Sequence, residues 1–163
     1  MRLRNAWHAR AFGSMVKAFL KLPAVVVHGR AQAEWALRVA AGRPLLLLSA
    51  PGAALNAGPG WFKAVLEQAA AAHPGAPFTA ALDCADAPGA ALAALRAGFK
   101  LVIFDLGHPS AASVLGAARE AGAEVLGIRP EALDLGTLDP RRRDDERRIS
   151  ALFATVPPQD QPT

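Results

Sequence analysis

Two carboxylates stand at the ends of two consecutive apolar segments of this chain. Asp83 ends the segment 78–83, and Asp105 ends the segment 101–105. The carboxyl ends of parallel strands meet at one edge of a sheet, and acids placed there are typical of α/β active sites. A carboxylate in such a place can donate and accept a proton. Asp83 is therefore a candidate catalytic acid/base, with capping of the following turn as the structural alternative.

Other polar side chains follow the remaining apolar runs. His28 comes after 24–27 and Ser49 after 45–48, while His108 lies three residues beyond Asp105. The Gly- and Pro-containing loop behind Ser49 could hold a phosphate through backbone N–H groups, but it matches no phosphate-binding motif. The candidate ligand-binding residues are His28, Ser49, Asp105 and His108, and a solvated turn is the alternative for each.

Cys84 is the only cysteine, and it follows Asp83 directly. A single cysteine excludes an intramolecular disulfide and a zinc site made of several cysteines. A thiolate can bind zinc together with histidines, whereas a buried free cysteine usually behaves as a small apolar residue. We expect no cofactor and keep zinc at Cys84 as an alternative.

The elements that must position these residues alternate regularly. Between the apolar runs lie segments of roughly 10–15 residues with helical patterning, as in βαβ units. Continuous apolar runs are typical of strands that are covered on both faces. The pattern predicts an α/β domain with a five-stranded parallel sheet. Its strands are expected at 24–27, 45–48, 78–82, 101–104 and 124–128.

Two arrangements of these strands are compatible with the pattern. Sequential order gives a half TIM-barrel-like sheet with helices on one face, and its exposed apolar face would favour a homo-oligomer, such as an isologous dimer. The order 2-1-3-4-5 gives a flavodoxin-like, three-layer domain. The second arrangement is consistent with a degenerate receiver-like interaction module, because Asp83 ends the third strand and Arg129 follows the fifth.

Charge and composition divide the chain into three parts. Residues 1–21 form a basic amphipathic arm with five bases and no acid, residues 22–130 form the α/β domain, and residues 131–163 form a charged, partly disordered tail. No basic and aromatic pattern of the nucleic-acid modules is present. No apolar run approaches the ~20 residues of a transmembrane helix. These features and the single cysteine predict a cytoplasmic protein that binds no nucleic acid.

Several short motifs resemble one enzyme family. They are Ser-Ala-Pro-Gly at 49–52, Ala-Leu-Asp-Cys at 81–84, Ala-Gly-Phe at 97–99 and Val-Ile-Phe-Asp at 102–105. In type and order, residues 22–128 resemble the N-terminal half of a class II, metal-dependent fructose-bisphosphate aldolase barrel. In that family, the acid at the place of Asp83 transfers the proton, and a metal-binding histidine stands where this chain has a cysteine.

The resemblance implies a truncated aldolase-like domain whose metal-binding motif is degenerate. We therefore expect an α/β protein without lyase activity that binds or senses a small molecule, for example a phosphate ester. One alternative is an active carbon–carbon lyase of the class II aldolase type that uses Asp83 as acid/base. The receiver-like interaction module is the other.

Overall fold

The computed structural model describes residues 17–154. The first sixteen residues, and with them most of the expected basic arm, lie outside this range, as does the end of the expected tail. Within it, no helix is both long enough and apolar enough to cross a membrane.

From β1 to β5 each pair of successive strands is separated by helix, as expected, with two helices, α3 and α4, between β2 and β3. The first ten elements are β1 (Ala24–Val26), α2 (Arg30–Ala40), β2 (Leu45–Leu48), α3 (Ala53–Asn56), α4 (Gly58–Ala72), β3 (Phe78–Asp83), α5 (Pro88–Arg96), β4 (Leu101–Ile103), α6 (Ala111–Glu120) and β5 (Glu124–Leu126). They are followed by β6 (Leu133–Asp134), the 3-10 helix η1 (Leu135–Thr137) and α7 (Arg143–Leu152). The expected α/β class is confirmed, and the sheet has one strand more than the expected five.

Proline and positive backbone φ angles set the ends of several helices. Pro59 and Pro88 stand in the first turns of α4 and α5, where the missing N–H has no helical partner to lose. Helix α2 ends at Ala40; Ala41, which follows it, has a left-handed φ of 48°, and Gly42 continues the turn with a φ of 80°. A left-handed residue allows the chain to leave the helix while its amides still bond to the last turn.

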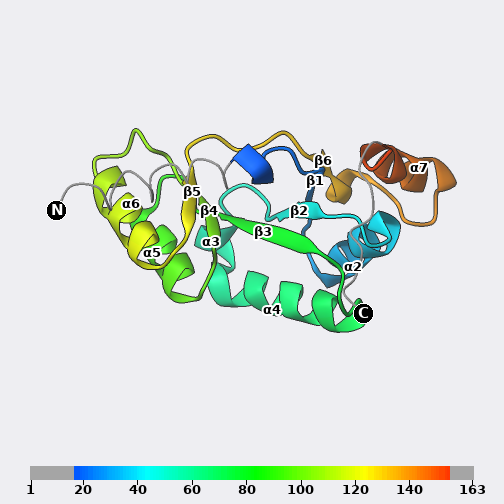
Figure 1. Cartoon of the computed structure of the whole chain (residues 1–163), viewed down its shortest axis with the longest axis horizontal. Helices are drawn as coiled ribbons and strands as arrows, with labels where there is room; N and C mark the ends of the chain where they lie inside the picture. The colour runs from blue at the N-terminus through cyan, green and yellow to red at the C-terminus, as the bar shows by residue number, and fades with distance from the viewer. Residues whose placement is uncertain (1–16, 155–163) are drawn as a thin grey trace.

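All six strands are parallel and lie in the order β5-β4-β3-β2-β1-β6. The first five are therefore sequential neighbours, as in the half-barrel arrangement, and the flavodoxin-like order 2-1-3-4-5 is wrong for this chain. Right-handed crossovers between sequential strands all place their helices on the same face. Accordingly, α2, α4, α5 and α6 lie on one side of the sheet in Figure 1.

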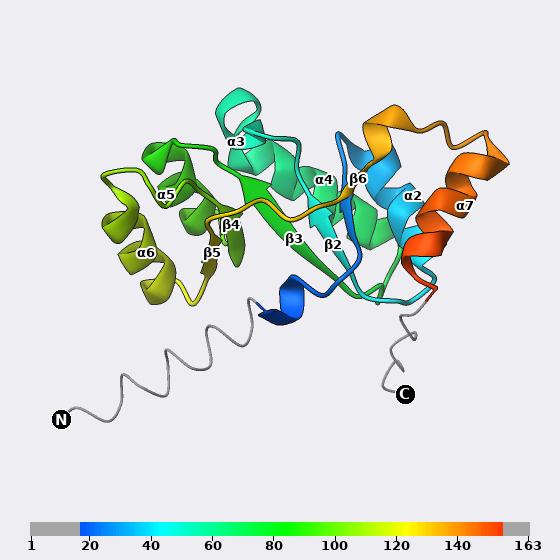
Figure 2. The same ribbon diagram turned by 90° about the horizontal axis from the view of Figure 1, so that it is seen from above.

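Strand β6 occupies the place of a closing strand. It pairs with β1 on the edge away from β2, where the last strand of a complete barrel meets the first. The chain reaches it through residues 127–132, here called the strap, which runs from β5 past β3 and β2 (Figure 2). Seven Cα–Cα steps reach about 23–25 Å, and five inter-strand spacings amount to about 24 Å. An almost extended strap is therefore long enough for the direct path.

The sheet face opposite the helices is apolar but not exposed. Leu46, Leu48 and Leu101 on this face have no solvent exposure, and Phe19, Leu22 and the strap residue Ala132 pack against their cluster. The exposed apolar face, which was the physical reason to expect pairing of two chains, is thus already covered within one chain. The oligomeric state itself stays a prediction.

Residues 133–154 pack against the core. They do not form a separate charged tail. Leu135 and Ile149 are fully buried and Phe153 is 3% exposed, all within the core on the helix-covered face. Helix α7 packs against α2, with Arg143, Asp144, Arg147 and Arg148 exposed and Asp145 buried. The expected boundary at residue 130 therefore does not separate a folded domain from a solvated segment.

A pair of isoleucine variants tests the role of the C-terminal segment. Ile149→Ala should lower the free energy of unfolding by about 2–5 kcal/mol, because it leaves a cavity under α7. Ile128→Ala is the matched control, since Ile128 on the strap is 84% exposed, and its effect should stay within about 0.5 kcal/mol. Urea unfolding measures both. Equal effects would contradict a packed C-terminal segment.

Candidate functional site

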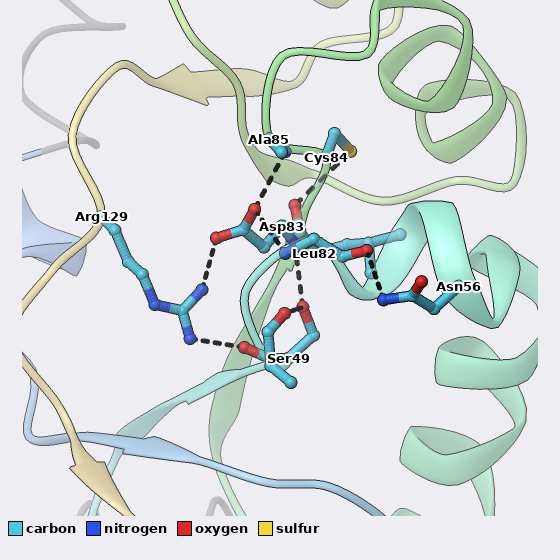
Figure 3. Close-up of polar contacts among 9 residues, drawn as sticks. Ser49, Asn56, Leu82, Asp83, Cys84, Ala85 and Arg129 are labelled. Carbon is cyan, nitrogen blue, oxygen red and sulfur yellow. Dashed lines mark hydrogen bonds and ion pairs between the residues drawn. The ribbon is translucent and has the colours of Figure 1, made fainter.

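The Asp83 carboxylate lies at the carboxyl end of β3 and is almost completely enclosed. The residue is 5% exposed. Its Oδ1 accepts hydrogen bonds from the backbone N–H groups of Gly52 (3.1 Å) and Ala85 (2.9 Å), and its Oδ2 accepts one from Nη1 of Arg129 (2.5 Å) (Figure 3). A carboxylate offers about four acceptor positions. Three of them are already in use.

The turns that surround Asp83 are built by local backbone geometry. Gly52 has a φ of 64°, which costs a glycine nothing and directs its N–H at the carboxylate. Ala85 has a φ of 49°, an unfavourable angle for a residue with a Cβ, at about 1–3 kcal/mol. Its carbonyl also accepts the Asp105 N–H at 2.9 Å, so this one turn joins the ends of β3 and β4.

The Arg129 side chain extends from the strap and contacts the ends of both β2 and β3. Besides its contact with Asp83, its Nη2 donates to the carbonyl oxygen of Ser49 at 2.6 Å. The Ser49 side chain is fully buried; its Oγ accepts the backbone N–H of Asp83 at 2.9 Å and donates to the carbonyl of Ala50 at 3.1 Å. Ser49, Asp83 and Arg129 therefore form one continuous polar network, here called the strap anchor.

Arg129 is the residue of this network that is not among the candidate site residues. The only sequence signal for it is its place after the fifth strand, followed by Pro130. Its partner Asp83 is 46 residues away, so no local pattern indicates the contact. The covering strap that carries it becomes apparent only when the order of all six strands is known.

His28 contacts Asp134, a residue that the sequence did not indicate as its partner. Its Nε2 is 2.7 Å from Oδ1 of Asp134, at the ends of β1 and β6. Gly136 donates its N–H to the same oxygen at 2.8 Å, and a Cβ on Gly136 would come within 2.8 Å of the imidazole. Burial acts to raise the pKa of Asp134, but the Gly136 hydrogen bond, the His28 contact and the charge of Arg129 together lower it.

Asp105 and His108 stay in the turn behind β4. Asp105 is exposed, and its Oδ1 accepts the Gly107 N–H at 2.8 Å. His108 accepts the Ser110 N–H at its Nδ1 (3.0 Å) and places its ring edge-on to Phe104, with centroids 5.7 Å apart. Of the predicted site residues, the structure thus joins Ser49 and Asp83 directly, pairs His28 with Asp134, and uses Asp105 and His108 in local contacts.

Cys84 faces the core between the sheet and the helices. It has no solvent exposure, and burial, followed by the charge of Asp83, raises the pKa of its thiol to about 12. A zinc ligand must be a thiolate that faces the metal. Within residues 17–154 no three His, Cys, Asp or Glu side chains come together in a group that could hold a metal ion. The zinc site of the expected family therefore does not fit this set of donors.

Comparisons with known proteins support the fold. No protein-family model and no curated protein sequence matches the chain. Among solved structures, it is similar to one from Coccidioides immitis described as a "putative fructose-1,6-biphosphate aldolase", with a TM-score of 0.50 and 22% identity. The likeness covers 64% of this chain and 44% of that chain. The chain therefore has an aldolase-like fold, while the class II assignment and the truncation stay predictions.

Removing the Arg129 guanidinium tests the strap anchor. Arg129→Ala should lower the free energy of unfolding by about 3 kcal/mol, because it leaves the buried Asp83 carboxylate without its charged partner. Adding Asp83→Asn should recover part of this loss. The control is Arg147→Ala, whose ion pair with Asp144 is exposed and worth at most about 1 kcal/mol. Denaturant unfolding of these three variants and the wild type measures the effects. Equal losses from Arg129→Ala and Arg147→Ala would contradict a structural anchor.

The Cys84 thiol should resist alkylation in the folded protein. A pKa near 12 in place of 9.0 reduces the thiolate fraction at pH 8 by about a thousandfold. Iodoacetamide should therefore label urea-unfolded chains quickly and folded chains very slowly. Because folding raises the pKa of the Cys84 thiol, its ionisation favours the unfolded chain. The rate at which iodoacetamide labels the native protein should therefore rise as the pH increases above 9. Rapid native labelling at pH 8 would show that the thiol is accessible.

Proposed function

We propose that this chain is an aldolase-like α/β domain that binds a small molecule at the carboxyl edge of its sheet without cleaving carbon–carbon bonds. The observation that supports this proposal is the strap anchor. In it, Asp83, the acid expected to transfer protons, accepts hydrogen bonds from three donors. A base must be within reach of the substrate proton. Asp83 would have to release Arg129 before it could take that role.

The ligand class we propose is a phosphate ester. Arg129 uses two of its five N–H donors in the anchor, and its side chain is 24% exposed. Guanidinium groups suit phosphate because they bind its oxygens in pairs. His28, whose side chain is 40% exposed at the same edge, is the second group proposed to contact the ligand. The carboxyl edge is also where ligands of parallel α/β sheets usually bind.

The two alternatives find less support. An active class II lyase needs metal ligands, and the described donors do not provide a set of them. A receiver-like module needs the 2-1-3-4-5 strand order, which this sheet does not have. Neither alternative accounts for the contact of the partly exposed Arg129 with the enclosed carboxylate of Asp83.

The proposal predicts binding without turnover. Titration calorimetry with fructose 1,6-bisphosphate should detect binding, and the same sugar phosphate should not be cleaved, with or without added zinc. Arg129→Gln should weaken binding about tenfold or more, as expected for a lost hydrogen bond to a charged group. Arg129→Lys, which keeps the charge and loses the paired geometry, should fall between. Arg147→Ala should bind like wild type.

Two outcomes of these experiments would contradict a binding domain without lyase activity. Cleavage that disappears in Asp83→Asn would overturn the proposal in favour of an active lyase. Failure of the sugar phosphate and of inorganic phosphate to bind the wild-type protein would also overturn it. Thermal melting of each variant checks that a loss of binding does not come from unfolding.

A further inference from the structure

A cavity lies at the amino-terminal end of the sheet, opposite the strap anchor. Its volume is about 470 Å³, within the roughly 300–1,000 Å³ of small-molecule sites. It lies between α4, the beginning of β3 and the turn that leads into β4; Figure 1 shows α4 running beside β3. None of the candidate residues at the carboxyl edge lines it.

The cavity exists because β3 is paired unequally. Its pairing with β2 begins at Phe78, opposite Leu45, but its pairing with β4 begins only at Leu82, opposite Val102. The first four residues of β3 therefore have no strand on the β4 side. Phe99, just before β4, stacks instead against a helix residue, Phe62, with centroids 6.0 Å apart and rings nearly parallel. The chain thus diverges from β3 and leaves the space open.

The walls of this cavity are mainly apolar, whereas its charged residues are mainly basic. The walls include Leu66, Phe78 and Phe99. Two lysines and one glutamate, Glu67, also line it. Lys63 donates to the carbonyl of Ala97 at 3.0 Å, at the end of α5. The second lysine, Lys100, is held in the same manner at the end of α6.

Both lysine ammonium groups donate to a carbonyl at a helix C-terminus, where the helix dipole favours a cation, and not to a carboxylate. Lys100 donates to the carbonyl of Ala121 at 2.6 Å, and a carbonyl, unlike a carboxylate, is a neutral acceptor. Each ammonium group has three N–H donors, so two remain on each after these bonds. No ion pair joins either lysine to an acid among the described contacts. Two exposed lysines that keep free N–H donors therefore line a mainly apolar cavity.

We propose that this cavity binds an amphipathic carboxylate, with the apolar body against the phenylalanine and leucine side chains and the carboxylate at Lys63 and Lys100. The apolar walls favour a hydrocarbon or aromatic body, and the lysines favour a single negative group. A peptide that pairs with the open edge of β3 is a poorer occupant, because four residues offer only about 13 Å of edge.

Octanoate and octanol are a matched pair of probes for this site. In ¹H–¹⁵N NMR titrations of the full chain, octanoate should shift the amides of 78–80 and 98–100. Lys63→Gln and Lys100→Gln should each weaken octanoate binding about three- to tenfold, as removal of one charged contact does. The neutral octanol should bind the wild type and both variants equally. Arg119→Gln, which removes an exposed cation of α6 outside the cavity, should change nothing.

A cavity-filling variant and an anchor variant complete the test. Ala70→Phe fills the space and should abolish octanoate binding while the melting temperature reports on folding. If that variant does not fold, the two lysine variants still decide. The proposal is overturned if octanoate does not bind the wild-type chain, if it binds the lysine variants unchanged, or if its shifts map elsewhere. Arg129→Gln should leave octanoate binding intact, which keeps this test independent of the one at the carboxyl edge.

Discussion

The contact of Arg129 with Asp83 and Ser49 is the interaction on which the rest of the structure depends. It fixes the middle of the strap to the ends of β2 and β3. The strap, in turn, delivers β6 to the free edge of β1 and places Ala132 on the apolar sheet face. A guanidinium is suited to this task because its fork geometry joins two oxygens at once. One side chain thereby connects the closing strand, the covered face and the candidate site.

The same interaction explains why an aldolase-like fold need not imply aldolase chemistry. Asp83 is retained at the end of β3, but its lone pairs serve the strap and two turns. Successive residues of a strand point to opposite faces, so Cys84 faces the helix-side core while Asp83 faces the strap. Burial then raises the pKa of the thiol to about 12. Asp83 and Cys84, which the sequence resemblance relates to proton transfer and metal binding, thus both have structural contacts in this fold.

The two ends of the sheet have opposite physical character. At the carboxyl end, Asp83 and Ser49 are enclosed by hydrogen bonds, while Arg129 and His28 stay partly exposed. At the amino end, β3 and β4 separate, and apolar walls meet two lysines with neutral acceptors. Unequal strand pairing produces this contrast, because an unpaired stretch of β3 leaves room that the helices do not fill. The described part of the chain therefore combines a polar network at one end of the sheet with an apolar cavity at the other.

Local patterns in the sequence determined the class of fold, because buried strands need apolar runs and helices need their Pro and Gly boundaries. The acid at the end of β3 and the five main strands follow from those patterns alone. Tertiary structure decided what they could not show. The two residues of β6 have no strand pattern and become a strand only beside the free edge of β1. Arg129 meets Asp83 across 46 residues, and this contact depends on the strand order, which local periodicity cannot encode because it carries no information about which edges meet.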